Sequence, residues 1–213
     1  MPHVLLGLSR RSSTACQHHQ WCVEIVVLFR EIEVKYSADN IKMEDFLKLV
    51  KQLPIRKKLM ISSYDDYFTR EGDEFVRYRH HMDRGELTIK KKTSEKNNND
   101  RIEVNLPTEG DNFAAVSAFV QLQGYDYNFG IYKTCNIFWT DKVDLVYYVV
   151  YDKELKEQRR FIEIEADEEA EWESEDEAWN EILKYEKMLE PLGITPKHRL
   201  RKSLFEIFRV ETD

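Results

Sequence analysis

Two segments near opposite ends of the chain carry acidic side chains on alternate residues, a spacing that suits the binding of metal ions. They are Glu31-Ile32-Glu33-Val34-Lys35 and Glu163-Ile164-Glu165. Side chains alternate between the two faces of a β-strand, so residues i, i+2 and i+4 share one face at intervals of roughly 6.5–7 Å. A face of two carboxylates and an ammonium group is costly to bury unless water, counter-charges or a metal ion meets it. The first segment alone fits an exposed strand equally well, and the second copy favours a functional face.

Charged residues occupy alternate positions in most of the other segments that alternate like half-buried strands. The eight predicted strands cover residues 26–36, 62–68, 74–79, 86–92, 101–106, 130–139, 144–151 and 161–166. Six of them alternate charged with apolar residues. The acids are Glu31, Glu33, Glu103, Glu163 and Glu165, and the bases are Lys35, Arg77, Arg79, Lys90, Lys92, Arg101 and Lys133. Solvent exposure alone does not explain so regular a pattern.

These strands predict an α+β fold built on an eight-stranded antiparallel β-barrel that forms a tunnel, with flanking helices. Turn signals at residues 71–73, 83–85 and 97–100 suit antiparallel hairpins. Helical patterns cover residues 43–53 and 112–122, a third helix follows the capping-box sequence Ser174-x-x-Glu177, and a short helix covers residues 201–208. Interior residues alternate with exterior ones along every strand of a closed barrel. We therefore expect the apolar positions to face the helices and the charged positions to line a water-filled bore.

A bore of this kind needs ligands of both signs. Buried bases require a polyanion, and clustered carboxylates require a divalent cation. A triphosphate with Mg²⁺ or Mn²⁺ supplies both, because carboxylate oxygens suit hard cations while Lys and Arg bind phosphate oxygens. The run of eight acids over residues 167–177 is typical of a solvated helix start, with a peptide- or cation-binding role as the alternative.

Length and composition limit the remaining classes. The 213 residues are enough for one good-sized core, so residues 23–213 are predicted to form a single domain. No apolar run approaches the roughly 18 residues of a membrane span, and three cysteines are too few for a disulfide framework, which favours a cytoplasmic protein. The net charge of -8 argues against a protein that coats polyanions in general. Residues 1–22 are predicted to be a disordered extension, or sequence upstream of the true start. The cluster from Cys16 to Cys22 matches no common zinc spacing.

The ordered set of motifs resembles the CYTH family, the triphosphate tunnel metalloenzymes, which include thiamine triphosphatases, inorganic tripolyphosphatases and class IV adenylyl cyclases. The family hallmark Glu-x-Glu-x-Lys is present as Glu31, Glu33 and Lys35. The likeness extends from about residue 27 to the C-terminus. It runs in family order through Asp65-Asp66-Tyr67-Phe68-Thr69, Arg77-Tyr78-Arg79, Leu87-Thr88-Ile89-Lys90, Arg101-x-Glu103, Lys133 and Phe161-Ile162-Glu163-Ile164-Glu165.

Two positions depart from the family pattern. The family commonly has Arg-x-Glu-x-Glu where this chain ends the motif with Asn105, and Lys-x-Arg where this chain follows Lys133 with Cys135. We expect the first change to weaken a metal site and the second to loosen the grip on the terminal phosphate.

The resemblance implies a hydrolase, a metal-dependent triphosphatase acting on a small-molecule triphosphate. Its implied metal ligands for Mg²⁺ or Mn²⁺ are Glu31, Glu33, Glu103, Asp152, Glu163 and Glu165. Its implied phosphate-binding residues are Lys35, Arg77, Arg79, Lys90, Lys92, Arg101 and Lys133. Lys35 and Glu33 are the expected catalytic residues, with Lys35 touching the reacting phosphate or orienting the attacking water.

Two other functions remain open at this point. One is a class IV-type adenylyl cyclase that makes cyclic AMP and pyrophosphate, and the other is a non-catalytic domain that binds triphosphates or polyphosphate, which Asn105 and Cys135 favour. No residue set for purine recognition is evident, so the hydrolase leads. RNA 5′-triphosphate is a further candidate substrate, but no separate basic patch or aromatic RNA platform recommends it. The chain is expected to be a monomer or homodimer without a membrane partner.

Overall fold

The computed structural model describes residues 29–71, 74–81, 84–92, 100–110, 112–167 and 169–209, without the side chains of residues 29–31, 91–92 and 100–102. The predicted N-terminal extension, with the cluster from Cys16 to Cys22, lies outside these ranges.

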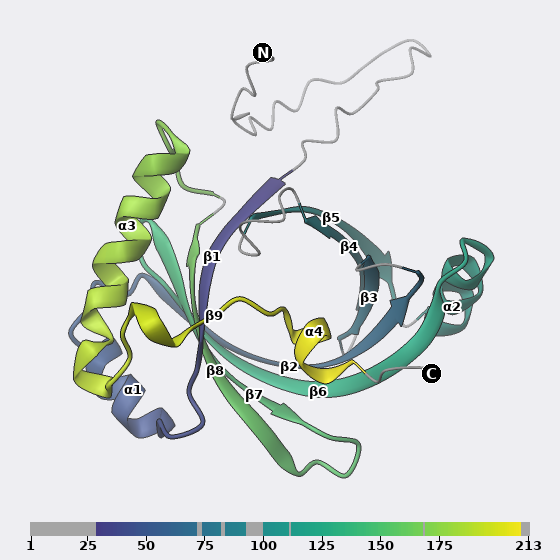
Figure 1. The fold of residues 1–213 in the computed structure, drawn as a ribbon, viewed down its shortest axis with the longest axis horizontal. Helices are drawn as coiled ribbons and strands as arrows, with labels where there is room; N and C mark the ends of the chain where they lie inside the picture. Colours follow the sequence, from purple (N-terminus) through teal and green to yellow (C-terminus); the bar gives the residue numbers. More distant parts are fainter. Residues whose placement is uncertain are drawn as a thin grey trace.

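All eight predicted strands are present, and a ninth, very short strand follows the third helix (Figure 1). The strands are β1 (Phe29–Ser37), β2 (Lys57–Thr69), β3 (Phe75–His80), β4 (Arg84–Lys92), β5 (Asp100–Glu109), β6 (Asp126–Trp139), β7 (Val143–Tyr151), β8 (Glu157–Ala166) and β9 (Arg199–Leu200). The helices are α1 (Met43–Val50), α2 (Phe113–Leu122), α3 (Glu175–Met188) and α4 (Leu204–Phe208). β2 begins at Lys57, before the predicted start at residue 62, because its first half pairs with β6.

The strands form one antiparallel sheet that curls into a ring. Their order is β5-β4-β3-β2-β6-β7-β8-β1-β9, and an additional pairing of β5 with β1 closes the ring. The first half of β1 pairs with β5, and its second half pairs with β8 on one edge and with β9 on the other. Figure 1 views this ring nearly end-on. The prediction of an α+β fold with a tunnel-like antiparallel sheet is confirmed.

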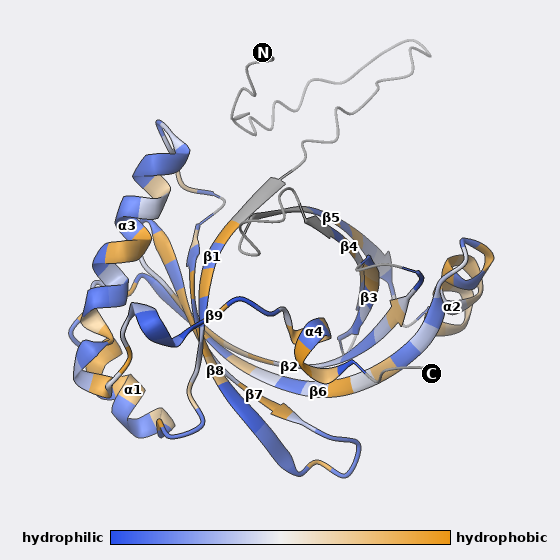
Figure 2. Ribbon diagram, in the orientation of Figure 1, coloured by the Kyte–Doolittle hydropathy of each residue, from blue (hydrophilic) through white to orange (hydrophobic). Residues whose placement is uncertain are grey.

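Helices cover parts of the outer face of the ring. α1 and α3 pack Phe46 and Ile182 against the outward residues Val34, Tyr36 and Ile164. Both helices carry hydrophobic as well as hydrophilic residues (Figure 2). α2 packs Val116 and Val120 against a separate apolar cluster of β2, β3 and β4. The apolar residues of these strand segments therefore face the helices, as alternation predicts.

The inner face is not charged throughout, which differs from the expected bore. Phe129, Tyr148 and Phe161 point inward and form an apolar cluster with Leu204 and Phe205 of α4. In Figure 1, α4 is drawn within the outline of the ring. A capping box formed by Ser203 and Glu206 starts this helix. The C-terminal helix thus fills part of the interior that the alternating pattern assigned to water.

Two helix boundaries follow local rules. Ser174 caps α3 by accepting a hydrogen bond from the backbone N–H of Glu177 at 3.2 Å, as its sequence predicts. α1 ends at Val50 rather than at residue 53, ahead of Pro54. Within the described part of the chain, no helix has the length and apolar character needed to cross a bilayer.

Candidate functional site

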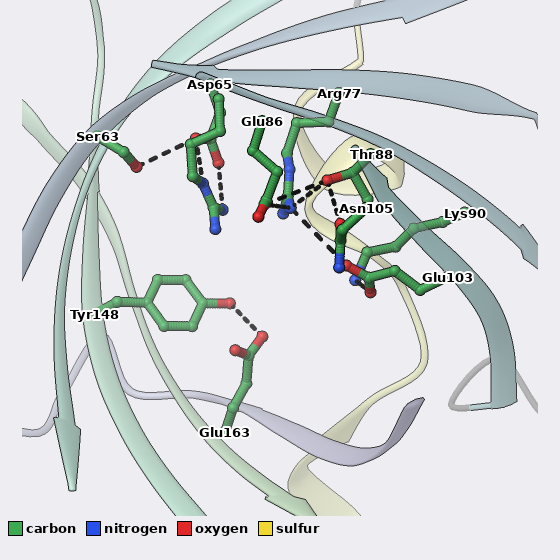
Figure 3. A network of polar contacts seen from close by, with 11 residues as sticks. Ser63, Asp65, Arg77, Glu86, Thr88, Lys90, Glu103, Asn105, Tyr148 and Glu163 are labelled. Carbon is green, nitrogen blue, oxygen red and sulfur yellow. Dashed lines mark hydrogen bonds and ion pairs between the residues drawn. The ribbon is translucent and has the colours of Figure 1, made fainter. Parts of the chain in front are cut away.

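Eight strands each contribute polar side chains to the inner face of the ring, and several of these side chains are buried. The contributors are Glu33 and Lys35 from β1, Ser63 and Asp65 from β2, Arg77 and Arg79 from β3, Glu86, Thr88 and Lys90 from β4, Glu103 and Asn105 from β5, Lys133 from β6, Tyr148 from β7 and Glu163 from β8. Figure 3 shows Tyr148 and Glu163 facing the side chains of the opposite wall across the interior.

Lys35 lies between two carboxylates from neighbouring strands. β1 and β8 pair in a register that places Lys35 opposite Glu163 and Glu33 opposite Glu165. The Nζ atom of Lys35 is 2.9 Å from Oε1 of Glu163 and 3.2 Å from Oε1 of Glu33. Like charges directly opposite each other in an antiparallel pair are destabilising. The ammonium group of Lys35 offsets the negative charge of Glu33 in this opposed pair.

Glu163 is held in its ionised form. Burial alone would raise the pKa of this carboxyl group. The positive charges of Lys35 and Lys133 and hydrogen bonds from Lys35 and Tyr148 act against burial and lower the pKa to about 2. Glu163 is therefore a carboxylate at neutral pH.

Tyr148 contacts both an acid and a base of the interior. Its hydroxyl group donates to Oε1 of Glu163 at 2.8 Å. The Nζ atom of Lys133 lies 3.9 Å from the centre of the Tyr148 ring, which is a cation–π contact. Burial, followed by the charge of Glu163, raises the pKa of Tyr148 well above its ordinary value, so the phenol remains a hydrogen-bond donor.

Arg79 is fixed by a fully buried carboxylate. The Nε and Nη2 atoms of Arg79 donate to the two oxygens of Asp65 at 2.8 and 2.7 Å, and the Ser63 hydroxyl donates to Oδ1 at 3.1 Å. Burial acts to raise the pKa of Asp65, but Arg79, Arg77 and Lys133 together hold it well below its usual range. This two-bond fork fixes the plane of the guanidinium group.

A second network joins β3, β4 and β5 (Figure 3). Arg77 donates to the hydroxyl of Thr88 at 2.8 Å and lies 3.3 Å from Glu86. Thr88 in turn donates to Oδ1 of Asn105 at 2.7 Å. The Nε–H of Arg77 is buried and has no hydrogen-bond acceptor among the described residues.

Glu103 closes this network on the β5 side. Lys90 Nζ is 2.5 Å from its Oε2 atom. Burial acts to raise the pKa of Glu103, while Lys90, Arg77 and a hydrogen bond from Asn105 lower it to about 2. Burial also raises the pKa of the Cys135 thiol, so Cys135 adds no charge to the interior.

The structure groups most of the residues that the sequence selects. Glu33, Lys35 and Glu163 meet through ion pairs, as do Arg77, Lys90 and Glu103. The side chains of Glu31, Lys92 and Arg101 lie outside the description, but their backbones are neighbours: Glu31 pairs with Arg101, and Arg101 pairs with Lys92.

Asp152 is not brought to this group. It lies in the loop between β7 and β8, where its Oδ1 atom accepts hydrogen bonds from the backbone N–H groups of Glu154 and Lys156 at 2.8 and 3.0 Å. Its carboxylate therefore stabilises a turn.

Six interior residues are not among the predicted site residues: Ser63, Asp65, Glu86, Thr88, Asn105 and Tyr148. Glu86 and Thr88 lie on the same face of β4 as Lys90, at two-residue spacing, so the periodicity of β4 could have found them. Asp65 adjoins Asp66, and only the pairing of Asp65 with Arg79 in β3 decides which of the two points inward.

The donor chemistry of the interior fits a hard divalent cation. The acids near Lys35 offer carboxylate oxygens, the ligands that Mg²⁺ and Mn²⁺ prefer. Among the described side chains, however, no three acids, histidines or cysteines gather closely enough to hold a metal ion. The ammonium group of Lys35 lies where the carboxylates of Glu33 and Glu163 converge.

Comparison with known proteins gives structural matches without sequence matches. No family model matches the chain, and no curated protein matches its sequence. A conserved hypothetical protein from Pyrococcus furiosus is 25% identical, with a TM-score of 0.65 over 84% of this chain and 99% of that one. Proteins named "putative adenylate cyclase" from Vibrio parahaemolyticus and Bacillus halodurans are 13% and 15% identical, with TM-scores of 0.58 and 0.55. These matches cover 83% and 84% of this chain and 96% and 98% of theirs. The likeness shows that this chain shares the fold of these proteins.

Proposed function

We propose that this chain binds a small organic or inorganic triphosphate in its tunnel and hydrolyses it with the help of Mg²⁺ or Mn²⁺. The observation that carries the proposal is the buried Nε–H of Arg77, which has no acceptor among the described residues. A buried donor without a partner costs about 1–3 kcal/mol. A phosphate oxygen in the tunnel would satisfy it.

The bases of the inner face support the binding of a chain of phosphates. Arg77, Arg79, Lys90 and Lys133 come from three strands, and the backbones of Lys92 and Arg101 pair between β4 and β5. Asp65 accepts hydrogen bonds from two nitrogens of Arg79, and the third, Nη1, donates to none of the described residues. Lys133 forms no ion pair with a described carboxylate, so its ammonium group keeps its charge for an anion.

The acids near Lys35 are the proposed metal ligands. Glu31, Glu33, Glu163 and Glu165 would hold the ion, with Glu103 as a further ligand. When bound, a divalent ion would neutralise phosphate charge and lower the pKa of a bound water. Lys35 would donate to the reacting phosphate or orient the attacking water, and the arginines would stabilise the charge that spreads over the transferred phosphoryl group.

A phosphate-release screen tests the proposal. Purified protein is incubated with thiamine triphosphate, tripolyphosphate, ATP or GTP, with Mg²⁺ or Mn²⁺ and with excess chelator. We expect phosphate release from at least one compound that stops with the chelator. Absence of phosphate release from all four compounds with either metal would contradict the proposal.

Two other functions are separated by the products. The names of the structural neighbours favour a cyclase, which would convert ATP to cyclic AMP and pyrophosphate, whereas a hydrolase would give nucleoside diphosphate and phosphate. Asn105, which places an amide where the family resemblance expects a carboxylate, favours a binding domain. That function predicts tight binding of tripolyphosphate without turnover in either metal.

The proposed compartment is the cytoplasm, because three cysteines in 213 residues give no disulfide framework.

A further inference from the structure

Tyr148 connects the acidic and the basic sides of the tunnel through one side chain. We propose that Tyr148 is a positioning residue that orients Glu163 for the metal ion and Lys133 for the phosphate chain. This inference rests on the proposed function of the tunnel. It assigns a role to a residue that carries no charge and lies outside every motif of the sequence.

The hydrogen bond from Tyr148 fixes one oxygen of Glu163. Oε1 accepts from the Tyr148 hydroxyl at 2.8 Å and lies 2.9 Å from Lys35 Nζ. Oε2 of Glu163 accepts no hydrogen bond from the described residues. Two donors on one oxygen set the plane of the carboxylate and leave the other oxygen for a ligand. Groups that orient a ligating carboxylate in this way typically contribute 10- to 100-fold to metal affinity.

The ring of Tyr148 supports Lys133 without neutralising it. The ammonium group lies 3.9 Å from the ring centre, and Lys133 makes no ion pair with the described carboxylates. A carboxylate in this place would cancel the charge of Lys133. An aromatic face attracts the cation but leaves its net charge and its N–H groups available for a phosphate oxygen.

Packing prevents Tyr148 from leaving this position. The side chain is fully buried, and its ring stacks on Phe161 with the centres 5.1 Å apart and the planes 24° apart. β7 pairs with β6 and β8 on its two edges, so the backbone of Tyr148 is also fixed. A rigid phenol can therefore serve both neighbours at once.

A purely structural hydrogen bond is the simpler explanation, and the next residue provides the matched control. Tyr147 is also buried, and its hydroxyl donates to the backbone oxygen of Ile41 at 2.8 Å. It belongs to the outer apolar core. The substitutions Tyr148→Phe and Tyr147→Phe each delete one buried hydroxyl from the same strand, on opposite faces.

The test is calorimetric titration of four proteins with Mn²⁺ and, separately and without metal, with tripolyphosphate. The proteins are the unmodified chain and the variants Tyr148→Phe, Tyr148→Leu and Tyr147→Phe. We expect Tyr148→Phe to weaken Mn²⁺ binding by about 10- to 100-fold and to leave tripolyphosphate affinity within about twofold, because the ring remains. Tyr148→Leu should also weaken tripolyphosphate binding, by about 3- to 30-fold. Tyr147→Phe should match the unmodified chain in both titrations.

Equal Mn²⁺ affinity in Tyr148→Phe and Tyr147→Phe would overturn the inference and leave the proposed function standing. If the unmodified chain binds neither Mn²⁺ nor tripolyphosphate, the proposed function fails and this inference fails with it. Thermal melts of all four proteins show whether they are folded, and Tyr148→Phe, which keeps the buried ring, decides the result if Tyr148→Leu does not fold.

Discussion

Lys35 of β1 and Glu163 of β8 lie directly opposite each other, with 2.9 Å between Nζ and Oε1. This contact joins the two acidic motifs, which are far apart in the sequence, into one site. Lys35 also pairs through its backbone with Leu200 of β9. The same lysine is therefore linked to the acids of the tunnel and to the segment that leads into α4.

The ion pair of Asp65 and Arg79 should make stability depend on pH. The pKa of Asp65 is lower in the folded protein than its ordinary 3.8, so the unfolded chain binds the proton more readily. Its stabilising contribution is full above about pH 5 and is lost as the pH falls below 3.8 towards the folded pKa. Asp65→Asn should lower the free energy of unfolding by about 3 kcal/mol at pH 7, since it leaves the partly buried Arg79 without its charged partner.

Denaturant unfolding of the unmodified chain and Asp65→Asn at pH 7 and pH 3 measures this effect. The difference between the two proteins should shrink at pH 3. A difference that is equal at both pH values would show that the carboxylate charge does not stabilise the fold.

A buried glutamate outside the tunnel should stabilise the segment that leads to α4. Glu186 of α3 accepts from Tyr36 at 2.5 Å and from Nε of Arg199 at 2.6 Å, and it is 3% exposed. Glu186→Ala should lower the free energy of unfolding by about 3 kcal/mol, because both partners lose their acceptor. The exposed control Glu190→Ala should stay within about 0.5 kcal/mol. If denaturant unfolding shows equal effects for Glu186→Ala and Glu190→Ala, the contacts of Glu186 with Tyr36 and Arg199 do not stabilise this segment.

Phe205 should be the main anchor of α4. Its ring stacks on Phe75 at 4.7 Å and on Phe129 at 6.1 Å between centres, and it is buried. Phe205→Ala should lower the free energy of unfolding by about 3 kcal/mol. This is the lower end of the range for a buried aromatic residue, because α4 is a short terminal helix. Phe119→Ala, at an exposed position of α2, is the matched control and should melt at the temperature of the unmodified chain. An equally small shift for Phe205→Ala would show that α4 packs only loosely.

Replacement of Asn105 tests whether the missing carboxylate limits metal binding. Asn105→Asp keeps an acceptor for the Thr88 hydroxyl and adds a negative charge near Glu103. We expect Mn²⁺ affinity to rise by about tenfold. The free energy of this change is a small part of the Coulomb attraction between Mn²⁺ and a nearby carboxylate. Asn180→Asp, on the exposed surface of α3, should change nothing. Unchanged affinity in Asn105→Asp would place the metal away from β5.

Local periodicity predicted the fold and much of the inner face. Glu33, Lys35 and Glu163 alternate with apolar residues that must face the helices, so their direction follows from the sequence alone. Tyr148 lies in an almost uncharged run, where alternation does not distinguish the inner face from the outer. Only the cross-strand partners of β7 fix its direction.

Tertiary contacts decide the remaining differences. Asp152 follows β7 directly in the sequence, but β7 ends at Tyr151 and the chain turns there. The carboxylate of Asp152 therefore accepts a backbone hydrogen bond within the loop. β9 forms because Arg199 and Leu200 pair with the free edge of β1. α4 enters the ring because Phe129 and Phe161 leave an apolar inner surface, which a pattern of charges does not reveal.

The most direct test of the proposed function is the rate of metal-dependent phosphate release by Glu163→Ala beside the surface control Glu169→Ala, on whichever triphosphate the screen identifies. If Glu163 holds the ion that activates the reaction, its loss should lower the rate by about 100-fold or more. The loss of a direct metal ligand should cost at least as much as the loss of a residue that only orients a ligand, which typically costs 10- to 100-fold. Glu169→Ala should keep the full rate, and both proteins should remain folded by thermal melt. Unchanged turnover in folded Glu163→Ala would contradict the assignment of the tunnel as a metal-dependent triphosphatase.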